Sequence, residues 1–187
     1  MHSASQPPPS QAALRDALIL ATQTAVTELQ STGEHFYYLT LITTGEALSP
    51  VLCAWSTEAL QRAAGDVITP EALLDLKWSY ADAPYFDVCK EAFEPVRRLF
   101  GARPAMVASM SEAEWMQEHA LRLGAMEDAL RAVDAAGLFG SDAARDNIVI
   151  NVEIMPPDGT NRARAKRLNP VVALRAWLRE TAEAASE

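Results

Sequence analysis

The chain has 187 residues and a mass of 20.3 kDa, the size of one ordinary domain, and 49% of its residues are apolar while 22% are charged. No apolar run reaches the roughly 18 residues of a membrane span, so the composition excludes membrane, collagenous and wholly disordered proteins. The start MHSASQPPPSQ lacks the basic and apolar segments of a secretory signal, and two cysteines cannot form a disulfide framework, so we expect a cytoplasmic protein.

Acids outnumber bases by 25 to 16, which gives a formal net charge of -9 and an isoelectric point near 4.8. A chain with this charge repels nucleic acid and anionic membranes and attracts basic proteins. We therefore expect a basic protein partner, and neither a nucleic-acid nor a membrane partner. The alternative is that the acidity serves solubility alone.

The first half of the chain predicts a helix followed by a hairpin. Residues 1–10 are rich in Ser, Gln and Pro and predict a disordered tail, and 11–187 is expected to form a single globular domain. Apolar residues recur at helical spacing from Gln11 onward, and we expect this helix to end at Gly33. The stretches 35–44 and 51–55 are aromatic and β-branched, and they predict two buried strands joined by a turn.

The middle of the chain predicts short helices and a third strand. Helices are expected over 57–65, capped by Ser56 or Thr57, and from Pro70 onward. Residues 76–80 suggest a third strand. A helix should follow over 84–100, with Asp82 as its N-cap and a kink near Glu91 caused by Pro95; its apolar face is Phe86, Cys89, Phe93, Val96 and Phe100.

The second half predicts a long helix, a strand and a last helix. Ser111 and Glu114 form a capping box for a helix whose apolar stripe is Met116, Ala120, Leu123, Leu130 and Val133. The strand 147–155 alternates strictly, so we expect Asn151 and Glu153 to face solvent and the other face to be buried, namely Ile148, Ile150, Val152 and Ile154. Residues 156–168 are expected to form a loop, and Asn169 to cap the last helix. The predicted fold class is α+β, with a small, mostly antiparallel sheet covered by several helices.

The templates for common catalytic chemistry are missing from the sequence. It contains no phosphate-binding glycine loop, no paired metal-ligand histidines or cysteines, and no nucleophile elbow, so we expect no cofactor and no metal. Glu114, Glu118 and His119 share one helix, but that spacing is more typical of a solvated acidic face than of a metal site. Cys53 and Cys89 both fall on surfaces assigned to the core, which argues against a cysteine nucleophile.

Three groups of residues remain as candidate binding sites. The first is an acidic helix face with an aromatic anchor, Glu112, Trp115 and Glu118. The second is a cleft that would be lined by Lys77, Trp78, Asp82 and Tyr85, although structural roles explain the same residues. The third is the dense basic cluster Arg162, Arg164, Lys166 and Arg167. It would contact phosphate or an acidic partner, or it is a solvated loop, or its arginines fold back on this acidic protein.

Four stretches give the chain a resemblance to a known family: FYYLTLITTGEALSPVLCAWSTEAL, LKWSYADAPY, GLFGSDAARDNIVINVEI and the LNP before the last helix. The chain resembles the bacterial family known as domain of unknown function 4303 from about Gln11 onward. That resemblance implies no catalytic or binding residues. Small acidic families of this kind are similar in style to toxin-immunity proteins.

Two functions follow from these observations. The chain is expected to be a non-catalytic protein that binds a macromolecule, such as an immunity-type protein that neutralises a basic toxin. The alternative is an enzyme or small-ligand binder with a cleft around 77–85. A flat acidic surface with exposed aromatic residues would favour the first, and a deep cavity with perturbed titratable groups would favour the second.

Overall fold

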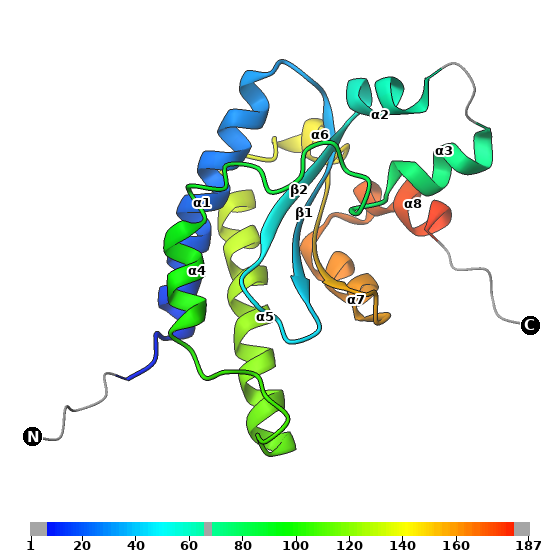
Figure 1. Ribbon diagram of the computed structural model, residues 1–187. Helices are drawn as coiled ribbons and strands as arrows, with labels where there is room; N and C mark the ends of the chain where they lie inside the picture. Colours follow the sequence, from blue (N-terminus) through cyan, green and yellow to red (C-terminus); the bar gives the residue numbers. More distant parts are fainter. Residues whose placement is uncertain (1–6, 66–68, 182–187) are drawn as a thin grey trace, which may run out of the picture.

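Strand β1, Phe36–Thr44, is the centre of the sheet and holds its two neighbours together in this computed structural model, which describes residues 7–65 and 69–181. It pairs antiparallel with β2, Val51–Ser56, and parallel with β3, Val149–Met155, so the strand order is β2-β1-β3. The α+β class is therefore confirmed, with mixed rather than mostly antiparallel pairing (Figure 1).

Helices cover both faces of this sheet, as Figure 1 shows. One face packs on α1, Gln11–Ser31, α4, Glu94–Gly101, and α5, Glu112–Ala135. The opposite face packs on α7, Thr160–Leu168, and α8, Val171–Glu180. The remaining short helices are α2, Thr57–Ala64, α3, Pro70–Lys77, and α6, Asp142–Arg145.

Burial of both faces overturns the expectation that one side of β3 faces solvent. Asn151 and Glu153 are 0% and 6% exposed, because α7 lies over the side of the strand on which they point. The Asn151 side chain donates to the Asn161 carbonyl at 3.3 Å and to Glu153 Oε1 at 3.2 Å. Alternation of polar and apolar residues is equally compatible with a buried polar row, so the pattern alone misled.

The predicted loop over 156–168 is wrong, because α7 occupies most of it. Two prolines and Gly159 end β3, and the helix starts directly after the left-handed Gly159. Its buried stripe does have helical spacing, but half of it is polar: Asn161, Arg164, Ala165 and Leu168. A stripe with an arginine and an asparagine is not recognised by apolar periodicity.

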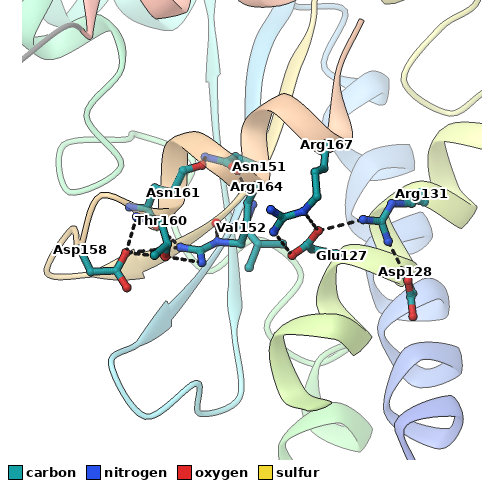
Figure 2. A network of polar contacts seen from close by, with 10 residues as sticks. All are labelled: Glu127, Asp128, Arg131, Asn151, Val152, Asp158, Thr160, Asn161, Arg164 and Arg167. Carbon is teal, nitrogen blue, oxygen red and sulfur yellow. Dashed lines mark hydrogen bonds and ion pairs between the residues drawn. The ribbon is translucent and has the colours of Figure 1, made fainter. Parts of the chain in front are cut away.

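The α7 stripe takes the place of a fourth strand along the open edge of β3 (Figure 2). Asn161 Oδ1 accepts from the Ile154 N–H at 2.8 Å, and its amide group donates to the Ile154 carbonyl at 3.3 Å. Asn169, which follows the helix, makes the same pair of bonds to Ile150, at 2.8 and 2.6 Å. Arg164 Nε donates to the Val152 carbonyl at 2.6 Å.

Asn169 is therefore an edge residue and not the predicted cap, and Pro170 is the N-cap of α8.

The edge of β2 is covered by backbone from the segment after α3. The Ala54 N–H donates to the Tyr85 carbonyl at 2.8 Å, and the Val88 N–H donates to the Leu52 carbonyl at 3.1 Å.

The expected third strand over 76–80 and the expected helix from residue 84 are both wrong. Asp87 and Cys89 adopt positive φ, so the chain bends here, and α4 begins only at Glu94 with Pro95 in its first turn.

Several helix boundaries were predicted correctly from capping residues. Ser56 caps α2, Ser111 and Glu114 form the capping box of α5, and Pro70 opens α3. The stripe of α5 is shifted, however: Met116 and Ala120 are exposed, while Leu123, Met126 and Leu130 are buried. Of the predicted tail, 1–6 lies outside the described residues, and Ser10 caps α1.

Replacing Asn169 by leucine should destabilise the fold, because it leaves the N–H and the carbonyl of Ile150 without partners at a covered edge. We expect the free energy of unfolding to fall by about 2–4 kcal/mol and the Ile150 amide to exchange faster with deuterium. Asn147→Leu is the control, since Asn147 is exposed and should cost less than about 0.5 kcal/mol. Equal losses in the two variants would contradict the edge role.

Candidate functional site: an acid-lined hollow beside α5

A hollow of about 400 Å³ lies between the β1–β2 turn, the loop after α4 and the start of α5. Its apolar lining consists of Met106, Val107, Ala108, Met110 and Trp115, and its charged lining consists of Glu46 and Glu112. No base belongs to this lining. The surface is therefore apolar at its centre and negative beside it, which suits a cationic or amphipathic group of a partner.

Glu46, in the turn between β1 and β2, is held in its ionised form by neighbouring groups. The Thr44 side chain and then the Glu46 backbone lower the pKa of the Glu46 carboxyl. Ala47 adopts positive φ, and its N–H donates to the Thr44 carbonyl at 2.8 Å, so the turn is a tight one. This turn places Glu46 at the hollow, a role that its position between two strands did not reveal.

The aromatic anchor is fixed by a neighbouring histidine. Trp115 stacks on His119, with ring centroids 4.7 Å apart and an interplanar angle of 16°. Burial and then Arg164 lower the pKa of His119, so its neutral form is favoured. A flat, half-buried indole held by stacking is pre-organised to receive an apolar or cationic group.

Glu118 does not belong to the acidic surface that the sequence suggested. It is 5% exposed and forms ion pairs with both Arg103 and Arg122, the latter at 2.7 Å. Burial alone would raise the pKa of Glu118, but the two guanidinium groups lower it. Arg122 also donates to the Pro104 carbonyl at 2.8 Å, so this triad holds the loop that forms one wall of the hollow.

The basic cluster of the sequence is divided by the helix that carries it (Figure 2). Arg164 is buried at the edge of β3, and Arg167 pairs with Glu127 of α5 at 2.7 Å. Arg162 and Lys166 are exposed, and the Arg167 side chain is also half exposed despite its ion pair. The interpretation in which arginines fold back on an acidic protein accounts for Arg164 and Arg167.

The residues of the suggested cleft at 77–85 contact different parts of the fold. Lys77 Nζ and Trp78 Nε1 reach Glu180 of α8 at 2.8 and 2.9 Å. Asp82 does not cap a helix, because the next helix begins only at Glu94, and its carboxylate accepts from the Ser79 hydroxyl at 2.7 Å. Tyr85 donates to Glu34 at 2.7 Å, at the opposite end of the segment.

The two cysteines differ in exposure. Cys53 is buried on the sheet, and burial raises the pKa of its thiol to about 12. Cys89 is only half-buried, which corrects the expectation that both lie in the core. Burial and the Glu28 carboxylate, which accepts from the thiol at 2.7 Å, raise the pKa of Cys89 to about 12. Neither environment favours a thiolate.

Neither a metal-binding cluster nor a membrane-crossing helix is found in the described part of the chain. Across 7–65 and 69–181, no group of three or more His, Cys, Asp or Glu side chains is placed to hold a metal ion. None of the helices in that part of the chain has the length and apolar character needed to cross a bilayer.

Comparison with known proteins identifies a family for most of the chain. Residues 18–170 match the family model described as "Domain of unknown function (DUF4303)". No curated protein matches the chain. No solved structure matches it either. The match runs from α1 to the start of α8 and so includes the whole sheet and the hollow.

Replacing Glu118 by glutamine should leave two buried guanidinium groups without a countercharge. We expect the free energy of unfolding to fall by about 3–5 kcal/mol in urea titrations. Glu112→Gln, an exposed change on the same helix, should cost less than about 0.5 kcal/mol. A small and similar loss of unfolding free energy in both variants would show that the buried charge of Glu118 does not stabilise the fold.

Glu180 should make folding sensitive to acid. Burial would raise its pKa, but Lys77, Trp78 and Arg179 lower it from 4.5 to about 2. A carboxyl with a depressed folded-state pKa stabilises fully above its unfolded pKa, and that contribution is lost as pH falls toward about 2. Unfolding midpoints measured from pH 6 to pH 2 should therefore fall less steeply in Glu180→Gln than in the parent or in the control Glu71→Gln.

Proposed function

Since the chain belongs to the DUF4303 family, whose description states no activity, we propose from the hollow beside α5 that this protein binds a basic protein partner. The observation that carries the proposal is the combination of Glu46, Glu112 and Trp115 around one apolar depression. A positively charged toxin neutralised by its immunity protein is the case that the acidic composition favours.

The hollow suits one long basic side chain of the partner. The methylene groups of an arginine or lysine would lie against Trp115 and the methionines, and the cationic head would reach the carboxylates of Glu46 and Glu112. Hot spots of interfaces are often such buried anchors with charged groups at their edge. Two further exposed apolar residues, Leu48 and Met116, would extend the contact.

The distribution of charge favours attraction of a basic partner over attraction of an acidic one. Most basic side chains are already paired with acids of the same chain, including Arg103, Arg122, Arg145 and Arg167. The surplus acids therefore dominate the surface, and Glu46 and Glu112 stand where the surface is concave. An approaching basic protein would be steered toward them, with a rate that falls as salt screens the charges.

The test compares capture of partners by three immobilised proteins. The parent and the control Glu71→Lys/Asp75→Lys should retain the same basic protein from a native lysate, because those two acids are exposed on α3, away from the hollow. Glu46→Lys/Glu112→Lys carries the same charge change and should lose it. Quantitative mass spectrometry measures the retained fraction.

The association rate of the captured protein provides the second measurement. It should fall at least about tenfold between 50 and 500 mM salt for the parent, and the hollow variant should start lower. Equal capture by both charge-reversed variants would exclude the hollow as the site. A partner that binds equally fast at every salt concentration, or that is acidic, would contradict the proposed function.

A further inference from the structure

A second cavity, of about 320 Å³, lies between the end of α1, the start of β1 and the loop that joins α5 to α6. It shares no lining residue with the hollow beside α5. Its walls are mainly apolar and include Val26, Leu29, Phe36, Leu39, Phe139 and Ile148. Apolar cavities of about 150 Å³ already hold benzene, so this one has room for a substituted ring.

The wall opposite α1 is fixed by two glycines and one hydrogen bond. Gly137 and Gly140 have φ of 79° and 88°, and the bends they allow place Phe139 inside, at 1% exposure. Gln30 Nε2 at the end of α1 donates to the Leu138 carbonyl at 2.7 Å. This bond ties the two walls together, so the cavity is part of the folded structure and does not depend on a ligand to form.

The rim carries a carboxylate that is ionised and already neutralised. Glu34 pairs with Arg62 at 2.6 Å and accepts from the hydroxyls of Ser56 and Tyr85. These contacts, led by Arg62, lower the pKa of Glu34 to about 2. Because the charged members of the lining, Glu34 and His35, are both already paired, a ligand of either charge would lose its hydration here without gaining a free countercharge.

The remaining polar groups of the rim offer mainly acceptors. The Gln30 amide nitrogen is used by Leu138, and the Asn147 amide nitrogen donates to the Ala143 carbonyl at 2.8 Å. Each amide group keeps one N–H and both lone pairs of its oxygen, so acceptor sites outnumber donors at the rim. His35 Nδ1 lies 2.6 Å from Glu58 Oε1, so that neighbouring histidine is also held at the rim.

From this lining we infer that the cavity binds a small neutral molecule with a ring-sized apolar body and a single hydrogen-bond donor, of the phenol class. The ring lies against the half-buried side chains of Phe36, Leu138 and Ile148, over the buried apolar floor, and the hydroxyl donates to an amide oxygen of the rim. This site is independent of the protein-binding hollow. It also differs from the cleft expected at 77–85, of which Tyr85 contacts two lining residues, Glu34 and Phe36.

The test uses three ligands of nearly the same shape, p-cresol, toluene and p-toluate, titrated into the full chain and followed by NMR shifts of backbone amides. p-Cresol should shift the amides of Leu39 and Phe139 and bind about tenfold more tightly than toluene, the ratio expected for one hydrogen bond. p-Toluate should not bind at the same concentrations. Equal affinity for toluene, or tighter binding of p-toluate, would overturn the inferred ligand class.

Two matched substitutions on α6 locate the site. Ala144 lines the cavity, whereas its exposed neighbour Ala143 does not, so Ala144→Phe should abolish p-cresol binding and Ala143→Phe should preserve it. Leu138→Phe fills the cavity from the loop and replaces Ala144→Phe if that variant does not fold. Unchanged binding in a folded, cavity-filled variant, or no shifts with p-cresol in the parent, would refute the proposal. Capture of a protein partner is unaffected by either result.

Discussion

The need to satisfy the open edge of β3 organises the second half of this protein. A three-stranded sheet buried on both faces has two edges whose N–H and carbonyl groups must find partners away from water. Along β3 these partners are side chains of Asn161, Arg164 and Asn169. The position and orientation of α7 follow from these bonds, because its polar stripe has to run along the strand.

The same requirement explains the charge distribution. A buried arginine at the edge needs acids around it, and Asp158 and Thr160 lie on its solvent side, with Arg164 Nη1 donating to the Thr160 hydroxyl at 2.6 Å. Arg167, one turn further, reaches across to Glu127 and connects α7 with α5. Many bases of the chain are thus paired with its own acids, and the acids at the hollow are left to set the field outside.

The sequence predicted those elements whose local signals agree with their tertiary surroundings. The central strand, the hairpin and the capping box of α5 combine apolar periodicity with turn or cap residues, and all three are present. The segment 156–168 and Glu118 were misjudged, because a charged residue looks the same in a sequence whether it is solvated or buried with a partner. The sequence pattern singled out Glu112 and Trp115. The position of Glu46 at the hollow and the cavity near Glu34 depend on contacts between residues far apart in the sequence, so no local pattern predicts them.

Coverage of both sheet edges restricts how another molecule can dock. Many recognition domains capture an extended peptide by adding it as a further strand, through main-chain hydrogen bonds that are almost independent of sequence. Here Asn161, Arg164 and Asn169 occupy that ladder on one side, and the backbone of Tyr85 and Val88 occupies it on the other. Binding must therefore rely on side-chain complementarity, and the same coverage leaves no ready template for sheet-to-sheet aggregation.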